Sequence, residues 1–224
     1  MTFDLPPVDP WARAKKAIAG IYSFTADKLY EPLVVKGAFP LLGGDLHAAV
    51  RDQGARAVAA ADGAPVLDMP VGTGFFTVDV AARSPGLVIG ADLAAGMVVE
   101  TDKVARRRGL ANLSGVQADA HRLPFANGSF GAVLCTNGLP VIPGLKPTLA
   151  ELGRVLRPGG ALLVSVVSMV FVGAGMSARA NQRLPTMMKS RGALLSEIER
   201  TGFVLKDVRT QRFATLVEAE KLSS

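Results

Sequence analysis

The sequence predicts a doubly wound α/β domain, in which a seven-stranded, mostly parallel sheet ends in an antiparallel hairpin and follows a helical N-terminal extension. Three observations predict this class. Short apolar runs recur from residue 65 onward, helix-length segments separate them, and the last two strand-like segments have almost no connector. Apolar strands that alternate with helices are typical of a parallel sheet covered on both faces. Strands joined so tightly are antiparallel, because a parallel connection needs a dozen or more residues.

The first sixty residues favour helices. Asp9 and Pro10 form an N-cap and first-turn pair, and we expect this first helix to end near Gly20. Asp45 is expected to cap a second helix, and Gly63 closes the region. The apolar residues of that second helix share one face, namely Leu46, Ala49, Val50 and Ala57.

The alternation of apolar runs and longer segments places the elements of the core. The expected parallel strands are Pro65–Leu67, Leu87–Gly90, Leu113–Val116, Ala132–Cys135 and Ala161–Val167. The expected helices between them include Phe75–Arg83, Glu100–Arg108 and Thr148–Leu156. The expected hairpin consists of Phe203–Gln211 and Phe213–Glu220. We therefore expect a single domain over residues 1–224, with a helical lid over 1–62 and the α/β core over 63–224.

Composition excludes several classes of protein. Of the 224 residues 49% are hydrophobic, which is too apolar a composition for disorder. A single cysteine, Cys135, excludes a disulfide scaffold, and two histidines far apart, His47 and His121, argue against a metal centre. No signal peptide and no apolar stretch of spanning length is visible. We therefore expect a cytoplasmic protein without membrane insertion.

The net charge of +6 raises the question of an anionic partner. Four of the basic residues gather in one expected helix: Lys103, Arg106, Arg107 and Arg108. A solvated helix face explains this cluster better than a nucleic-acid site, because no aromatic residues interleave with the charges. The sequence thus argues for a small-molecule partner and against nucleic acid, and it leaves a homodimer open.

The strongest signal for chemistry is the segment Val66–Gly74, a strand that runs into a glycine turn and then a helix. Glycines let backbone amides approach a ligand closely, and a helix N-terminus adds partial positive charge. The turn has Thr77 where a dinucleotide fingerprint has its third glycine, and it lacks the lysine of a P-loop. Asp68 at the strand end suits a ligand with an ammonium group. For the turn alone, an ordinary strand–helix connection remains the alternative.

Two further carboxylates follow the next two strands. Asp92 ends the second strand, where a carboxylate can accept hydrogen bonds from a ribose diol. A helix N-cap is the alternative interpretation of Asp92. Asp119 follows the third strand, where an acceptor can bind the exocyclic amine of a purine.

Together these residues resemble the class I S-adenosylmethionine-dependent methyltransferases, and among them the small-molecule enzymes of menaquinone and ubiquinone biosynthesis. The resemblance covers about residues 60–167. Four motifs carry it in order, namely Asp68–Gly74, Asp92, Asp119–Phe125 with Gly128–Phe130, and Arg154–Gly160. It implies a Rossmann-like fold, S-adenosylmethionine as the cofactor and S-adenosylhomocysteine as the product.

The resemblance also implies a role for each matching residue. The methionine part of the cofactor would lie against the first turn, the ribose against Asp92, the adenine against the ends of the second and third strands, and the sulfonium near the fourth strand. The implied cofactor contacts are, in chain order, Asp68, Pro70, Gly72, Thr73, Gly74, Asp92, Leu93, Met97, Asp119, Ala120, Thr136 and Asn137. The segment Arg157–Gly160 would be a turn with a structural role.

The chain departs from the family at two places. Pro70 stands where the family usually has glycine, and Gly138-Leu139-Pro140 stands where the family often has a histidine. We therefore name no catalytic residue. Apolar segments at the expected carboxyl ends of the strands favour a hydrophobic acceptor pocket, with Tyr22, Phe24 and Leu139 as candidate contacts.

The interpretation that follows is a methyltransferase for a small, apolar or aromatic acceptor. An RNA or protein methyltransferase is one alternative, motivated by the positive net charge. A cofactor-binding protein without transfer activity is the other, motivated by Pro70 and by the lack of an obvious base.

Overall fold

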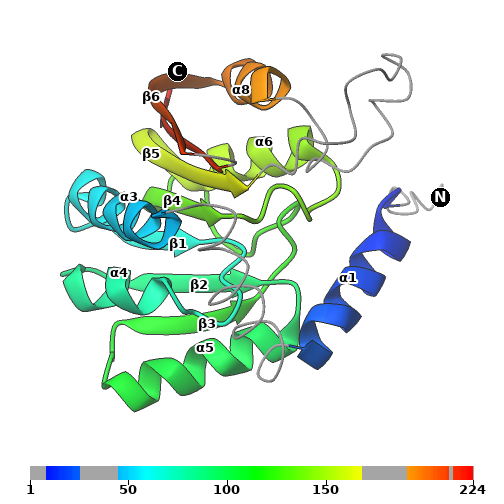
Figure 1. Ribbon diagram of the computed structural model, residues 1–224, viewed down its shortest axis with the longest axis vertical. Coiled ribbons are helices and arrows are strands. Elements are labelled where there is room, and N and C mark those ends of the chain that lie inside the picture. The colour runs from blue at the N-terminus through cyan, green and yellow to red at the C-terminus, as the bar shows by residue number, and fades with distance from the viewer. Residues whose placement is uncertain (1–8, 26–44, 168–190, 212–213, 224) are drawn as a thin grey trace, which may run out of the picture.

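The structure is a computed structural model that describes residues 9–25, 45–167, 191–211 and 214–223. Within these ranges seven strands form one sheet in the order β3-β2-β1-β4-β5-β7-β6 (Figure 1). The strands are β1 (Val66–Asp68), β2 (Val88–Asp92), β3 (Leu113–Gln117), β4 (Phe130–Thr136), β5 (Leu156–Val167), β6 (Phe203–Gln211) and β7 (Ala214–Lys221). The first five pair in parallel, and β7 runs antiparallel to both β5 and β6. The predicted fold class is therefore confirmed.

Helices cover both faces of the sheet. The described helices are α1 (Ala12–Thr25), α3 (Leu46–Ala61), α4 (Thr77–Arg83), α5 (Ala95–Arg108), α6 (Leu145–Val155) and α8 (Arg191–Arg200), of which α1 lies beside the strand ends in Figure 1. None of the described helices is long and apolar enough to cross a membrane.

Two apolar cores follow the alternation of side chains along the strands. In β1, Val66 belongs to the core that contains Ala57 of α3 and Val80 of α4. The next residue, Leu67, belongs to the core that contains Leu149 of α6. Helices α3, α4 and α5 therefore cover one face, and α6 and α8 cover the other.

The structure corrects the predicted boundaries near the N-terminus. Helix α1 continues through Gly20 to Thr25, since an isolated glycine costs a helix only about 1 kcal/mol and does not end it. Asp9 does cap this helix, because its Oδ1 accepts the Trp11 N–H at 2.9 Å. Asp45 precedes α3 as predicted, but its side chain makes no capping hydrogen bond.

The predicted turn before the fifth strand is also wrong. β5 begins at Leu156, so the segment Arg157–Gly160 lies within the strand. An irregularity takes the place of the turn there, with Gly159 at φ +70° and a shift in the register between β4 and β5. The glycines that suggested a turn instead let one continuous strand absorb extra residues.

Candidate functional site

A cavity lies at the carboxyl ends of the parallel strands. Eleven of the twelve cofactor contacts implied by the sequence line it: Asp68, Pro70, Gly72, Thr73, Asp92, Leu93, Met97, Asp119, Ala120, Thr136 and Asn137. The remaining lining residues are apolar apart from one lysine, namely Lys15, Met69, Val71, Phe75, Phe76, Val141, Ile142 and Pro143. The fold thus brings residues from four strand ends onto one wall.

The glycine turn after β1 has a conformation that its sequence permits. Gly72 and Gly74 have φ values of 58° and 75°, which residues with a Cβ rarely adopt. The Gly72 N–H donates to Asp92 Oδ2 at 3.0 Å, and the Gly72 carbonyl accepts from the Thr101 hydroxyl at 3.2 Å. Gly74 lies against Thr101 of α5 and is not among the described residues that line the cavity. The turn is therefore held by β2 and α5.

Asp68 is a buried carboxylate with half of its hydrogen-bonding capacity unused. Its Oδ2 accepts from the Thr77 hydroxyl at 2.6 Å, whereas its Oδ1 has no partner within the described residues. Burial raises the pKa of Asp68 to about 7; the Thr77 hydrogen bond opposes this rise, and the nearby Asp92 adds to it. The Thr73 hydroxyl is likewise buried without a partner. These two orphaned groups on the cavity wall suit a cationic or hydrogen-bonding ligand.

Asp92 is not the N-cap of α5, because Ala94 occupies that position without a side-chain capping hydrogen bond. Its Oδ1 accepts the Ala94 N–H at 2.9 Å ahead of α5, and its Oδ2 accepts the Gly72 N–H. Burial raises the pKa of Asp92, and these amide hydrogen bonds oppose the rise. A carboxylate offers about four lone-pair sites, so capacity for a ligand hydroxyl remains.

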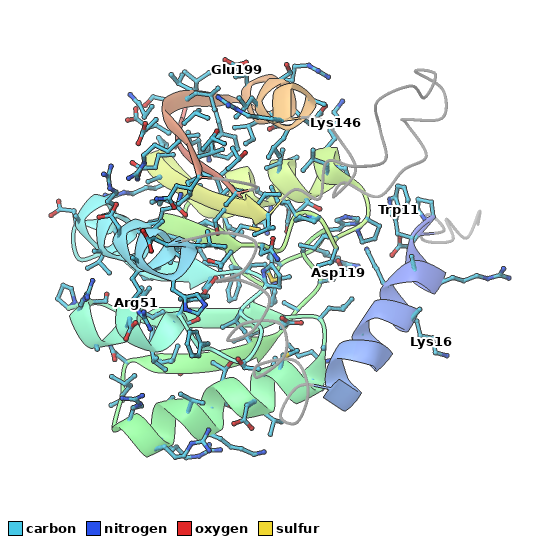
Figure 2. The ribbon with its side chains drawn as sticks, viewed as in Figure 1. Trp11, Lys16, Arg51, Asp119, Lys146 and Glu199 are labelled. Carbon is cyan, nitrogen blue, oxygen red and sulfur yellow. The ribbon has the colours of Figure 1, made fainter. Side chains whose placement is uncertain are left out.

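Asp119 lies between the strand ends and α1, as Figure 2 shows. The Lys15 Nζ donates to Asp119 Oδ2 at 2.7 Å and to Asp9 Oδ2 at 2.9 Å. The His121 N–H donates to Asp119 Oδ1 at 2.9 Å. Burial lowers the pKa of Lys15, but the hydrogen bonds to Asp119 and Asp9 outweigh it and raise the pKa overall.

Lys15 is the site residue that sequence reasoning missed. That reasoning started the nucleotide site at Asp68 and left the N-terminal helices out of it, yet Lys15 lines the same cavity. The contact joins residues 104 positions apart. Nothing in the local pattern distinguishes Lys15 from the adjacent Lys16, so the sequence held no signal for this pair.

The loop after β4 is fixed by Asn137. This residue has φ 53°, its N–H donates to the Ser165 carbonyl at 2.7 Å, and its Oδ1 accepts the Val167 N–H at 2.9 Å. The loop also accommodates Pro70, because the Pro70 ring fills the space into which a Cβ on Gly138 would point. Thr136 and Asn137 consequently line the cavity from a rigid loop.

None of the three predicted acceptor contacts is among the described residues that line the cavity. Leu139 is only 1% exposed and belongs to the apolar core with Leu149, rather than to the described cavity wall. Leu139 is buried because its side chain packs into the apolar core beneath the loop that follows β4. Tyr22 and Phe24 fall within α1, but their side chains lie outside the part of the chain that the structure describes.

An aromatic cluster contributes apolar surface to the cavity instead. The rings of Phe75 and Phe76 are 5.0 Å apart and nearly perpendicular, and the His47 ring lies 5.7 Å and 5.4 Å from them. Both phenylalanines line the cavity. The signal that could have found them is the Phe-Phe pair directly after the glycine turn.

Cys135 and His121 carry side chains that can take part in proton or nucleophile chemistry, and the structure describes both. Cys135 is fully buried, and burial together with the nearby Asp68 raises its pKa to about 12, so its thiol stays protonated at neutral pH. The His121 Nε2 is buried and has no hydrogen-bond partner among the described residues, and His121 is not among the described residues that line the cavity. The structure therefore adds no catalytic residue.

Comparisons with known proteins agree with this site. Residues 66–160 match the family described as "Methyltransferase domain". A demethylmenaquinone methyltransferase from Beutenbergia cavernae is 42% identical over 112 residues, which cover 50% of this chain and 44% of that protein. A ubiquinone/menaquinone biosynthesis C-methyltransferase UbiE from Francisella philomiragia is 30% identical over 160 residues, which cover 69% of this chain and 61% of that protein. The chain spans about half the length of the curated relatives it matches.

Solved structures share the fold at low sequence identity. A SAM-dependent methyltransferase from Aquifex aeolicus superposes with a TM-score of 0.67 at 16% identity, covering 91% of this chain and 98% of that one. The [4+2]-cyclase SpnF superposes with a TM-score of 0.66 at 19% identity, covering 78% of this chain and 81% of that one. By sequence, residues 66–160 of the chain are thus a methyltransferase domain, and the fold is shared with a solved S-adenosylmethionine-dependent methyltransferase.

Proposed function

We propose that this chain transfers a methyl group from S-adenosylmethionine to a small, planar acceptor of the quinone type. One observation carries the proposal: Asp68, Asp92 and Asp119, from the ends of three neighbouring strands, line one cavity whose other described lining residues are mostly apolar. The names of the curated relatives support the class of acceptor, since they act on demethylmenaquinone or in ubiquinone and menaquinone biosynthesis.

The acidic side chains of the cavity fit the proposed cofactor. When bound, S-adenosylmethionine supplies an electrophilic methyl group on a sulfonium. The orphaned Asp68 Oδ1 would accept from the ammonium group, and the free lone pairs of Asp92 would accept from the ribose hydroxyls. Asp119 and the backbone of Ala120 would meet the adenine edge. Each of these groups is fixed by the fold before a ligand arrives, which limits the entropy that binding costs.

The apolar side chains of the cavity fit the proposed acceptor. Phe75 and Phe76 offer aromatic surface, and Val141, Ile142 and Pro143 continue the apolar wall. Aromatic side chains pack well against a planar ring. Methyl transfer is an in-line displacement, so holding the acceptor in alignment and excluding water supplies much of the catalysis.

Of the expected lid 1–62, α3 packs against the sheet, so the segment that contains α1 is proposed as a lid over this cavity. The contact of Lys15 with Asp119 supports the proposal, because it brings α1 to the cavity. Deleting residues 1–40 should abolish methyl transfer while S-adenosylhomocysteine binding is weakened but retained. A folded truncation that methylates its acceptor at the full rate would contradict the lid.

The environment of the basic cluster favours a small molecule over nucleic acid. Lys103 and Arg107 both pair with Glu100 on the same helix, at 3.1 Å and 2.7 Å. Such pairs are typical of a solvated helix face.

Cys135 is buried and free, which fits the proposed location in the cytoplasm.

Two measurements test the function. Calorimetry with S-adenosylmethionine, S-adenosylhomocysteine and NAD should detect binding of the first two and not of the third. Mass spectrometry should then detect a methylated product from a reduced naphthoquinone that lacks the ring methyl group. Methylation of bulk RNA or protein but not of the quinol would favour the macromolecular alternative. Cofactor binding without any product would favour a protein that, like the cyclase SpnF, is not named for methyl transfer.

A further inference from the structure

We propose that Lys15 is a positioning residue of the cofactor site, which holds the Asp119 carboxylate toward the purine edge and so couples the docking of α1 to cofactor binding. The inference rests on the proposed function, because it deepens the role of the acidic side chains of the same cavity. Its starting point is the ion pair that joins α1 to the segment after β3.

Lys15 forms ion pairs with two carboxylates, those of Asp9 and Asp119. Asp9 is itself held by the Trp11 N–H at the start of α1, and its other oxygen accepts from the Lys15 Nζ at 2.9 Å. The same Nζ reaches Asp119 Oδ2 at 2.7 Å. The Lys15 residue is only 8% exposed. An ammonium group removed from water is stable here because two carboxylates compensate it.

Asp119 is held in one orientation by contacts on both of its oxygens. Its Oδ2 accepts from Lys15 and its Oδ1 accepts from the His121 N–H at 2.9 Å. Each oxygen offers two lone pairs, so each keeps one free. The Asp119 side chain is 30% exposed and lines the cavity. The carboxylate can therefore accept from an exocyclic amine without releasing Lys15.

This arrangement makes the site selective for adenine. An acceptor held rigidly at the purine edge favours a base that presents an amine there. A base with a carbonyl at that position would bring two acceptors together and leave both unpaired, which is how polar sites reject close analogues. Without Lys15 the carboxylate loses one of its two fixed contacts and can turn toward solvent.

The same contact links α1 to the ligand. If Lys15 helps Asp119 to bind the purine, then by thermodynamic linkage the bound purine helps Asp119 to hold Lys15. Couplings of this kind are typically about 5- to 150-fold in affinity. The ligand should therefore protect α1 from hydrogen exchange, and the protection should depend on Lys15.

The neighbouring Lys16 provides a matched control. It lies on the same helix, is exposed, and points away from the cavity in Figure 2. Lys15→Met and Lys16→Met remove the same charge from adjacent positions, whereas Lys15→Arg keeps the charge and its donors. Asp119 and Asp9 are both partly exposed, so water can satisfy them after the Lys15→Met change.

The test uses the full chain, with calorimetry against S-adenosylhomocysteine and its deaminated analogue S-inosylhomocysteine. We expect Lys15→Met to weaken S-adenosylhomocysteine binding by about 5- to 50-fold, within the range of such couplings. The ratio between the affinities of this variant for S-adenosylhomocysteine and for S-inosylhomocysteine should be smaller than in the wild type. Lys16→Met should bind both ligands like the wild type, and Lys15→Arg should restore most of the affinity and the preference. Ligand-induced protection of residues 12–25 should be lost only in Lys15→Met.

Three outcomes would overturn the inference. Binding of S-adenosylhomocysteine to Lys15→Met as tight as to the wild type would show that the Lys15–Asp119 pair does not contribute to binding, and tighter binding would show that Lys15 competes with the ligand for Asp119. An equal loss of affinity for both ligands would show a structural effect rather than positioning. Either result leaves the proposed function intact. A wild-type chain that binds neither S-adenosylmethionine nor S-adenosylhomocysteine would overturn the proposed function and, with it, the role of Lys15.

Discussion

Acidic side chains meet opposite conditions in the C-terminal hairpin and at the cavity. In the C-terminal hairpin, Glu218 of β7 pairs with Arg56 at 3.1 Å and with Arg209 at 3.2 Å in partly exposed surroundings. At the cavity, Asp68 and Asp92 are buried, and the ion pairs among the described residues include neither of them. The hairpin acid Glu218 is compensated by the chain itself, whereas Asp68 and Asp92 are not; the third cavity acid, Asp119, is paired with Lys15.

The difference indicates where the chain carries charge for a ligand rather than for stability. An exposed ion pair contributes about 0–1 kcal/mol and is easily replaced. A buried carboxylate without a cation costs the ligand-free fold several times more. Such a cost is retained at sites where function requires the group. The predictions below test this contrast from its largest expected effect to its smallest.

The ligand-free protein should lose stability as the pH rises from about 4 to about 7. Burial raises the pKa of Asp68 in the folded state from 3.8 to about 7, so the folded chain keeps this proton longer than the unfolded chain. The resulting stabilisation is fully present below the unfolded pKa and is lost as the pH passes through the folded pKa. About three pKa units correspond to at most ~4 kcal/mol.

Urea denaturation of the wild type and Asp68→Asn between pH 4 and pH 8 measures this effect. The free energy of unfolding of the wild type should fall relative to that of the variant over this interval, because other titrating groups cancel in the difference. A difference that does not change with pH would show that the buried carboxylate costs the fold nothing.

Asp68→Asn should weaken S-adenosylhomocysteine binding at pH 8 by about 10- to 100-fold. A hydrogen bond to a charged group contributes about 1.5–3 kcal/mol, and the amide no longer carries the charge that the ammonium needs. Calorimetry measures the dissociation constant. Asp207→Asn, which removes an acid of the hairpin paired with Arg209 at 2.9 Å, is the control and should leave it unchanged. If the wild type, Asp68→Asn and Asp207→Asn bound S-adenosylhomocysteine with equal affinity, ligand binding would not explain why the chain retains the buried Asp68 carboxylate.

Asp92→Ala should lower both cofactor affinity and thermal stability. The affinity loss is expected at about 1.5–3 kcal/mol from the ribose hydrogen bonds. The melting temperature should fall as well, because the amides of Gly72 and Ala94 lose their acceptor. Differential scanning calorimetry and titration calorimetry measure the two effects separately. A lowered melting temperature with an unchanged dissociation constant would leave Asp92 only the structural role of accepting the Gly72 and Ala94 amides.

Glu218→Gln in the hairpin should have the smallest effect. Its partners Arg56 and Arg209 are partly exposed, so the loss of unfolding free energy should not exceed about 1 kcal/mol. The affinity for S-adenosylhomocysteine should not change. A loss of several kcal/mol in unfolding free energy would mean that the hairpin ion pairs matter as much for stability as the buried acids of the cavity, which contradicts the contrast.

The fold was largely predictable because its signals are local and repeated. Each parallel strand is a short apolar run, and the two cores use alternate residues of that run, as Val66 and Leu67 do in β1. The predicted turn at Arg157–Gly160 failed because glycine and proline mark a bulge as readily as a turn. Local composition does not distinguish the two, since pairing with the neighbouring strand decides between them.

Only the part of the candidate site that lies at the ends of the parallel strands could be predicted from the sequence. Asp68 and Asp92 follow directly from where the strands end, since parallel strands place their carboxyl ends at one edge. Lys15 and Phe76 were not predicted, because their places depend on how α1 and the start of α4 pack against the sheet. Leu139 was expected at the acceptor but lies in the core, because apolar character does not reveal which side of a loop faces the cavity.

The contact between Pro70 and Gly138 makes these two positions epistatic. The proline ring fills the space into which any side chain at 138 would project, and Cys135 Sγ lies 3.1 Å from the position that a Cβ would take. A histidine could therefore enter at position 138 only after Pro70 had been replaced by a smaller residue. The order of substitutions is thus constrained, and an ancestor or a designed variant that acquires a side chain at 138 must pass through a chain without the proline.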